Sequence, residues 1–201
     1  MGTILLTSQG FYNQKIIDTF NAYSKDLKDF PALIITTACD DKNNNKWAIK
    51  AKESLIHFGY KKVDLHDIEE DTKQDYSQYK TIYVAGGNGF RLTKSCKENN
   101  FSKIIVDCLN SGGAYVGVSA GSVLLAPSIL LEAVFEPEKI PDDFNDFSGL
   151  GIIPFTIMPH YNPQFENDLV EFERTHGYKI HRLTNEEFIL LSDFEFKTLI
   201  G

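Results

Sequence analysis

Ser119 has the local sequence that most clearly predicts chemistry in this chain. It lies in Gly117-Val-Ser-Ala-Gly121, which fits G-x-S-x-G, the pattern of a serine nucleophile on a sharp strand-to-helix turn. The flanking glycines remove Cβ atoms that would collide where the strand reverses into the helix. Such a turn places the hydroxyl at a helix N-terminus, where free N–H groups favour the negative charge that develops in acyl transfer. The competing interpretation is a turn of small residues that merely packs a helix close to a sheet.

A serine nucleophile needs a base, and the five histidines of the chain differ in their placement. His160 follows a strand-like apolar run and a proline, so we expect it to project from the sheet edge that carries Ser119. The other four lie in or beside predicted helices and strands, where structural roles are expected: His57, His66, His176 and His181. In combination with the G-x-S-x-G turn, His160 is the favoured base.

The base normally needs a partner on its far ring nitrogen. Polar residues that follow a C-terminal strand could supply that partner, and so could an acidic residue that follows the nucleophile helix. The candidates are Asn185, Glu186, Glu187 and Glu132. Surface charge is the alternative interpretation of each, and the residues alone leave the choice open.

Two backbone segments could stabilise an oxyanion. One donor is the N–H of Ala120, and the second is expected from Gly86-Gly-Asn-Gly89, where glycine lets the backbone approach a substrate oxygen closely. This loop lacks the G-x-G-x-x-G and P-loop spacings of phosphate sites. The sequence has no H-E-x-x-H, cysteine pair or histidine cluster, so we expect neither a metal nor another cofactor.

Alternating strands and helices must position these residues. The expected strands are 3–7, 32–37, 61–68, 81–85, 114–118, 155–158, 178–183 and 187–191, with a final hairpin arm at 197–200. Helices are expected at about 13–28 and 46–58, from about 90, from about 102, after Ser119, and at 164–176. The acidic stretch 132–147 is expected to cross the surface.

This alternation predicts a three-layer, doubly wound α/β fold with right-handed crossovers and a mostly parallel sheet. Ligands of such sheets bind beyond the carboxyl ends of the strands. The loop at 86–89 and the turn at Ser119 would then lie close together if strands 81–85 and 114–118 are neighbours.

The composition is that of an ordinary globular protein, with 42% hydrophobic and 24% charged residues. We expect one domain over residues 1–201. The net charge of −8 argues against nucleic acid and anionic membranes as partners, and no apolar run is long enough to span a membrane. The N-terminus does not resemble a signal peptide, and three irregularly spaced cysteines predict no disulfide framework, so we expect a cytoplasmic location.

Three segments, in this order, resemble those of the peptidase E family of serine peptidases, the aspartyl dipeptidases of family S51. They are Ala85-Gly-Gly-Asn-Gly-Phe90, Gly117-Val-Ser-Ala-Gly-Ser122 with Ala126-Pro127 behind it, and Met158-Pro-His-Tyr161. The resemblance covers nearly the whole chain. It implies a class I glutamine amidotransferase-like, flavodoxin-like fold in which serine replaces cysteine.

The resemblance also implies roles for individual residues. It makes Ser119 the nucleophile and His160 the base. It further makes the backbones of Gly87 and Ala120 the oxyanion donors, with Asn88 beside them.

The chain departs from the family pattern in two places. The third catalytic member in relatives is an acid shortly after the strand that follows the histidine, and the closest match here is Asn185, with Glu186 next to it. Aspartyl specificity in the family relies on arginine to hold the substrate carboxylate. This chain has only three arginines and an acidic stretch after His160, so we expect no strict preference for N-terminal aspartate.

The favoured function is therefore a serine peptidase acting on short peptides, in the manner of a dipeptidase. An esterase of the α/β-hydrolase type is one alternative, and it needs an acid between the serine and the histidine, for which the candidates are Asp142, Asp143 and Asp146. A non-catalytic binding protein on the same fold is another, motivated by the asparagine at 185. The sequence is compatible with both a monomer and a homodimer.

Overall fold

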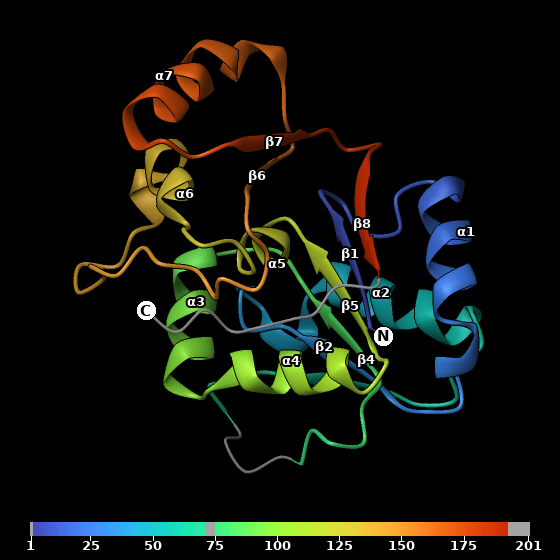
Figure 1. The fold of residues 1–201 in the computed structure, drawn as a ribbon. Coiled ribbons are helices and arrows are strands. Elements are labelled where there is room, and N and C mark those ends of the chain that lie inside the picture. Colours follow the sequence, from blue (N-terminus) through green and yellow to red (C-terminus); the bar gives the residue numbers. More distant parts are fainter. Residues whose placement is uncertain (1, 71–74, 193–201) are drawn as a thin grey trace.

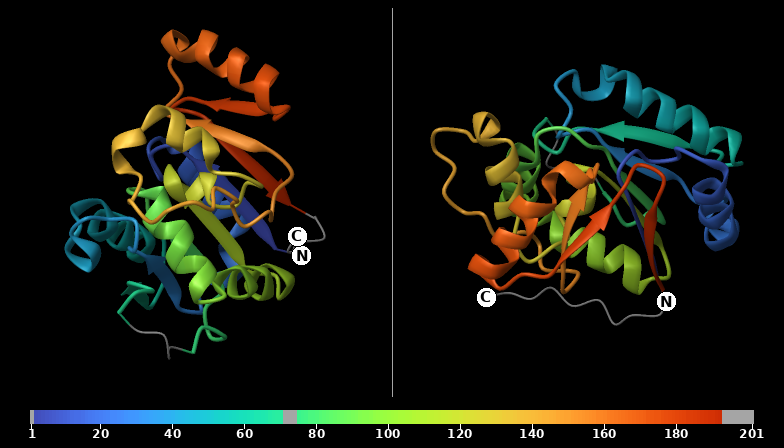
Figure 2. Two further views of the ribbon diagram at one scale, coloured as in Figure 1. Left: turned by 90° about the vertical axis from the view of Figure 1, so that its left-hand side faces the viewer. Right: turned by 90° about the horizontal axis from the view of Figure 1, so that it is seen from above.

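The central element of the structure is a six-stranded sheet with helices on both faces (Figures 1 and 2). The computed structural model describes residues 2–70 and 75–192. Its strands lie in the spatial order β3 (Val63–His66), β2 (Ala32–Ile35), β4 (Thr81–Val84), β5 (Ala114–Val118), β1 (Thr3–Thr7) and β8 (Phe188–Ser192). Among these strands, β8 alone is antiparallel to its neighbour. This arrangement confirms the predicted α/β fold with a mostly parallel sheet.

Alternate residues of the strands pack on opposite faces of the sheet. Ile4 and Val84 pack with α3 (Gly89–Glu98) and α4 (Phe101–Asn110), whereas Leu5 packs with α1 (Gln14–Tyr23) and α2 (Lys46–His57). A strand that is covered on both faces has to be apolar along its length, which explains the nearly continuous apolar runs in the sequence. The strands at 81–85 and 114–118 meet the condition under which the loop at 86–89 would lie near Ser119, since β4 and β5 are hydrogen-bonded neighbours.

A second, smaller sheet stands apart from the first. It pairs β6 (Thr156–Pro159) with β7 (Ile180–Leu183) in parallel, and α7 (Glu166–His176) connects the two strands. Together with α6 (Leu130–Phe135) these elements enclose their own apolar cluster, in the upper part of Figure 1. The strand alternation does not reveal that β6 and β7 leave the main sheet.

The helix after Ser119 is a single turn, α5 (Ala120–Val123). Pro127 follows shortly, and the N–H groups of Leu150 and Ile152 donate to the carbonyls of Leu124 and Leu125, so these carbonyls bond to a crossing segment rather than to a longer helix. The expectation that 132–147 is only a surface excursion is wrong at its start, because α6 extends to Phe135.

The remaining elements are short 3₁₀ helices at Lys25–Leu27, Lys42–Asn44, Pro137–Lys139 and Pro163–Phe165. The expected hairpin arm at 197–200 lies outside the described residues. Within the described part of the chain, none of the helices has the length and apolar character that a membrane span requires.

Candidate active site

Ser119 occupies a strained turn between β5 and α5. Its backbone has φ 52° and ψ −115°, in the left-handed half of the map that costs a non-glycine residue about 1–3 kcal/mol. The neighbouring glycines allow the close packing of this turn. A Cβ atom on Gly117 would lie 2.7 Å from the carbonyl oxygen of Gly121, and one on Gly121 would overlap the carbonyl of Val84. The glycines of G-x-S-x-G are therefore required by contacts that the structure shows.

The end of β1 holds the nucleophile turn in place. The Ser119 N–H donates to the Thr7 carbonyl at 3.0 Å. The Ser122 hydroxyl donates to the same carbonyl at 2.8 Å and accepts the Thr7 N–H at 3.1 Å. The Thr7 hydroxyl donates to the Gly117 carbonyl at 3.0 Å. All of these groups except Ser119 are buried, so the turn is fixed from the side of the neighbouring strand.

The imidazole of His160 reaches Ser119 from the end of β6. Its Nε2 lies 3.1 Å from the Ser119 Oγ, and its Nδ1 lies 2.8 Å from the Asn185 Oδ1. Since an amide oxygen can only accept, Nδ1 carries the proton and Nε2 is left to accept the serine proton. The Oγ–Nε2 distance is within the range expected of a general base and its substrate.

Asn185 rather than Glu186 contacts the ring of His160. Glu186 contributes its backbone carbonyl, which accepts the Asn13 side-chain amide at 2.9 Å, and among the described interactions none joins its carboxylate to the imidazole. Glu187 is engaged in its own turn, because the N–H and hydroxyl of Thr184 both donate to its carboxylate. These bonds hold the pKa of Glu187 below its usual value.

Glu132, another candidate for the orienting role, lies elsewhere. Its carboxyl occupies the space above Gly89, where a Cβ atom on that glycine would overlap it. One carboxyl oxygen, Oε2, is buried without a hydrogen-bond partner. Burial, together with the nearby charge of Glu136, raises the pKa of Glu132 to about 8. A carboxyl that packs on Gly89, where burial disfavours its charged form, does not serve as a charged partner of His160.

The loop at 86–89 runs directly alongside the nucleophile. A Cβ atom on Gly86 would lie 2.9 Å from the Cβ of Ser119, and Gly87 has φ 142°, a conformation open to glycine. Among the described residues, the N–H groups of Gly87 and Ala120 have no hydrogen-bond acceptor, so both are available to an oxyanion.

Asn88 organises this loop. Its backbone N–H donates to the Ala38 carbonyl at 2.8 Å. Its side-chain oxygen caps α3 by accepting the Arg91 N–H at 2.9 Å, and its amide nitrogen donates to the Lys139 carbonyl at 3.2 Å. Asn88 is therefore beside the predicted oxyanion site, and its side chain is engaged in holding the loop.

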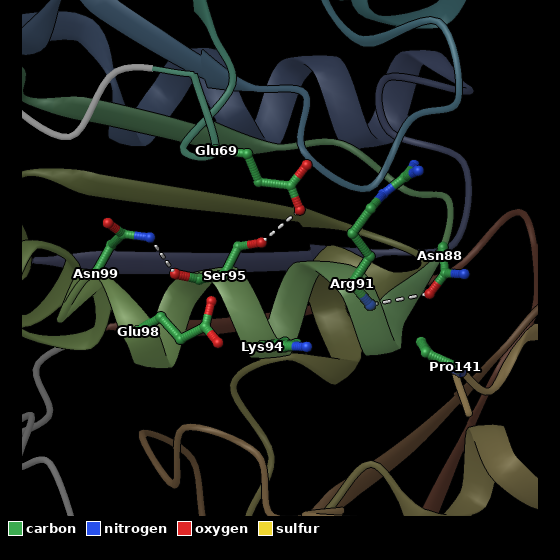
Figure 3. A pocket seen from close by; sticks show the side chains of 8 residues that line it. All are labelled: Glu69, Asn88, Arg91, Lys94, Ser95, Glu98, Asn99 and Pro141. Atoms are coloured by element: carbon green, nitrogen blue, oxygen red, sulfur yellow. Dashed lines mark hydrogen bonds between the residues drawn. The ribbon is translucent and has the colours of Figure 1, made fainter. Parts of the chain in front are cut away.

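A charged cavity of about 530 Å³ extends from Asn88 along α3 (Figure 3). Its charged groups are largely paired: Lys94 lies 2.6 Å from Asp143, and Ser95 donates to Glu69 at 2.7 Å. Arg91 donates to the carbonyls at 37 and 38 through Nε and Nη2. The arginine that lines this cavity is therefore engaged with backbone carbonyls.

The other two arginines are also held by acidic residues. Arg182 bonds both Glu166 and Glu173, and these partners raise its pKa. Arg174 pairs with Glu171 within α7.

The three cysteines are buried thiols, and the Cys39 thiol donates to the carbonyl of Gly86, beside the nucleophile turn, at 3.4 Å. Burial raises the pKa of Cys39 to about 11 and that of Cys108 to about 12, and it raises the pKa of Cys96 further. In the described part of the chain, no group of three or more His, Cys, Asp or Glu side chains could hold a metal ion.

Known proteins are similar to this chain in sequence and in fold. The profile of peptidase family S51 matches residues 4–199. The whole chain is 26% identical to the "Uncharacterized peptidase Lin0382" of Listeria innocua, a match that covers 98% of that protein. Over 63% of the chain, the identity to peptidase E of Shigella sonnei is 28%, covering 51% of the latter.

A crystal structure of a candidate peptidase E from Listeria monocytogenes has the same fold. The TM-score is 0.76 over 95% of this chain and 94% of that one, at 24% identity. This likeness confirms the predicted flavodoxin-like fold. Because the family profile spans nearly all of its residues, the chain belongs to peptidase family S51 and is a peptidase.

Proposed function

We propose that this peptidase is a serine-type enzyme that hydrolyses short peptides with Ser119 as nucleophile and His160 as base. One observation carries the proposal. An unbroken chain of two hydrogen bonds joins Ser119 Oγ to His160 Nε2, at 3.1 Å, and His160 Nδ1 to Asn185 Oδ1, at 2.8 Å. The backbone N–H groups of Gly87 and Ala120 lie beside the nucleophile, and neither donates to an acceptor among the described residues.

In the proposed reaction, Ser119 Oγ attacks the scissile carbonyl carbon while its proton passes to His160 Nε2. The negative charge on the former carbonyl oxygen is stabilised by the N–H groups of Gly87 and Ala120, and losing one such donor costs about 3–4 kcal/mol of barrier. The C–N bond then breaks as Nε2 returns the proton to the leaving amine. Water repeats the sequence on the acyl-enzyme, releasing the acid and restoring the serine.

Asn185 supplies orientation without charge. Its oxygen fixes the proton on His160 Nδ1, which is the tautomer that the base requires. A neutral amide cannot stabilise the imidazolium as a carboxylate does. His160 therefore depends more on its correct orientation than does a catalytic histidine that is paired with a carboxylate.

The role of Asn185 predicts a different effect for each of two variants. Asn185→Leu should lower kcat by about 10²–10³-fold, since the ring loses its orienting acceptor. Asn185→Asp should move the acidic limb of the kcat/KM profile to higher pH, because a carboxylate favours the protonated, inactive imidazolium. Initial rates on one dipeptide between pH 5 and 9 check both results. Glu186→Gln is the comparison, and a larger loss there than in Asn185→Leu would give the orienting role to Glu186.

The proposed substrates are short peptides without a strict requirement for N-terminal aspartate. All three arginines of the chain are engaged, either with carboxylates or with backbone carbonyls. An aspartate side chain in the site would have to displace one of these partners to gain an arginine contact.

Esterase activity of the α/β-hydrolase type has less support. Two of its candidate acids lie beside lysines of α3, with Asp143 at 2.6 Å from Lys94 and Asp146 at 2.8 Å from Lys97. The ring nitrogen that such an acid would contact is already bonded to Asn185. These contacts support the peptidase arrangement over the esterase arrangement.

A substrate panel combined with active-site labelling tests the proposal. Dipeptides and tripeptides with different N-terminal residues are assayed beside p-nitrophenyl esters, and a serine-directed phosphonate is mapped by mass spectrometry. We expect turnover of several dipeptides and a label on Ser119. Ester turnover without peptide turnover would favour the esterase, and a protein that neither turns over substrate nor takes the label would favour a binding function.

A further inference from the structure

Ser8 occupies a buried position between the two sheets. It follows β1 directly, and the residue as a whole is 1% exposed to solvent. Its hydroxyl accepts the His160 N–H at 3.0 Å and donates to the Leu183 carbonyl at 2.9 Å. One hydroxyl therefore joins the end of β1 to the last residue of β7 and to the residue that follows β6.

One partner of Ser8 is the candidate base itself, and the other lies close in sequence to the residue that orients this base. His160 has φ 54°, so its backbone is held in a left-handed conformation that needs support from its surroundings. Leu183 is the last residue of β7 and stands two positions before Asn185. Its carbonyl also accepts the Tyr161 N–H at 3.1 Å. The bonds of Ser8 thus fix the backbone on which the base and its orienting partner are mounted.

Thr7, the residue before Ser8, fixes the backbone of the nucleophile. The carbonyl of Thr7 accepts the N–H of Ser119 at 3.0 Å. Two consecutive residues at the end of β1 therefore hold the two halves of the site, the serine through Thr7 and the imidazole through Ser8. Because the halves belong to different sheets, the Oγ–Nε2 distance depends on this junction.

We propose that Ser8 is a positioning residue that sets the distance and angle between Ser119 and His160. The inference rests on the proposed function. Ser8 acts through the backbone of His160, so its loss should affect the chemical step more than substrate binding. Displacements of about 1 Å in reacting groups can cost about 100-fold in rate.

Ser8→Ala tests this role against a matched control. We expect kcat for a dipeptide to fall by about 10- to 100-fold with KM changed less than threefold, and phosphonate labelling of Ser119 to slow in parallel. Ser128→Ala removes a hydroxyl with the same bonding pattern, since Ser128 is 6% exposed, accepts the Leu130 N–H at 3.1 Å and donates to the Phe147 carbonyl at 3.1 Å. That variant should keep the wild-type kcat.

A double-mutant cycle separates positioning from general destabilisation. If Ser8 acts through the geometry of His160, adding Ser8→Ala to Asn185→Leu should cost much less than it costs in the wild type. Additive losses, or a wild-type kcat in Ser8→Ala, would overturn the proposal. If Ser8→Ala does not fold, Ser8→Cys replaces it, because the thiol has a similar shape and is a weaker hydrogen-bonding group. An inactive wild type would instead overturn the proposed function.

Discussion

Ser119→Ala is expected to lower kcat for peptide hydrolysis by at least about 10⁴-fold, because the nucleophile is removed and only oxyanion and binding effects remain. The fold should survive. The Ser119 hydroxyl makes no helix-capping bond and contacts a solvent-exposed imidazole. Alanine in the same backbone conformation has a similar strain to serine, so we expect the free energy of unfolding to change by less than about 1 kcal/mol.

Ser54→Ala provides the control for this variant. Ser54 is a half-buried residue of α2 whose hydroxyl donates to the Lys50 carbonyl, and its removal should change neither kcat nor labelling. Progress curves on a purified dipeptide and phosphonate mass spectrometry measure the two variants side by side. Full activity in Ser119→Ala, or a label at another residue, would contradict the assignment of Ser119 as the nucleophile.

The parallel sheet could be predicted because its evidence is local. Apolar runs such as 32–37 and 81–85 show that a strand is buried on both faces, and the glycines around Ser119 mark a sharp turn. The rule that ligands bind beyond the carboxyl ends of strands then brought 86–89 and Ser119 together, and the pairing of β4 with β5 confirms their proximity. The strands and the turn can be predicted from the sequence neighbours of each residue, whereas the pairing of the two strands entered the sequence analysis only as a condition.

Contacts between distant segments could not be predicted in this way. Ser8 meets His160 across 152 positions and Leu183 across 175, and nothing in its local sequence distinguishes it from an ordinary strand-ending serine. The choice between Asn185 and Glu186 depends on how the turn after β7 directs consecutive side chains. The pattern of apolar residues in β6 and β7 shows that they are strands and does not show that they form a separate sheet.

Gly87→Ala is expected to lower both activity and stability, because this position combines a tight contact with a proposed role in catalysis. Its φ of 142° disfavours any side chain, and a Cβ atom would overlap the Ala38 carbonyl and lie 3.1 Å from the Cys39 nitrogen. Both are backbone atoms, so the loop at 86–89 has to move. Since its N–H is a proposed oxyanion donor, we expect kcat to fall by about 10²–10³-fold.

The loss in Gly87→Ala must be separated from the ordinary cost of a side chain at positive φ. Gly112 has φ 82° with open space around it, so Gly112→Ala should cost about 1–2 kcal/mol of stability and leave kcat unchanged. Thermal unfolding and dipeptide kinetics on both variants give the comparison. A fall in stability alone, equal in the two variants, would mean that the Gly87 N–H does not stabilise the transition state. A fall in kcat confined to Gly87→Ala is the result expected if movement of the loop displaces the N–H beside Ser119.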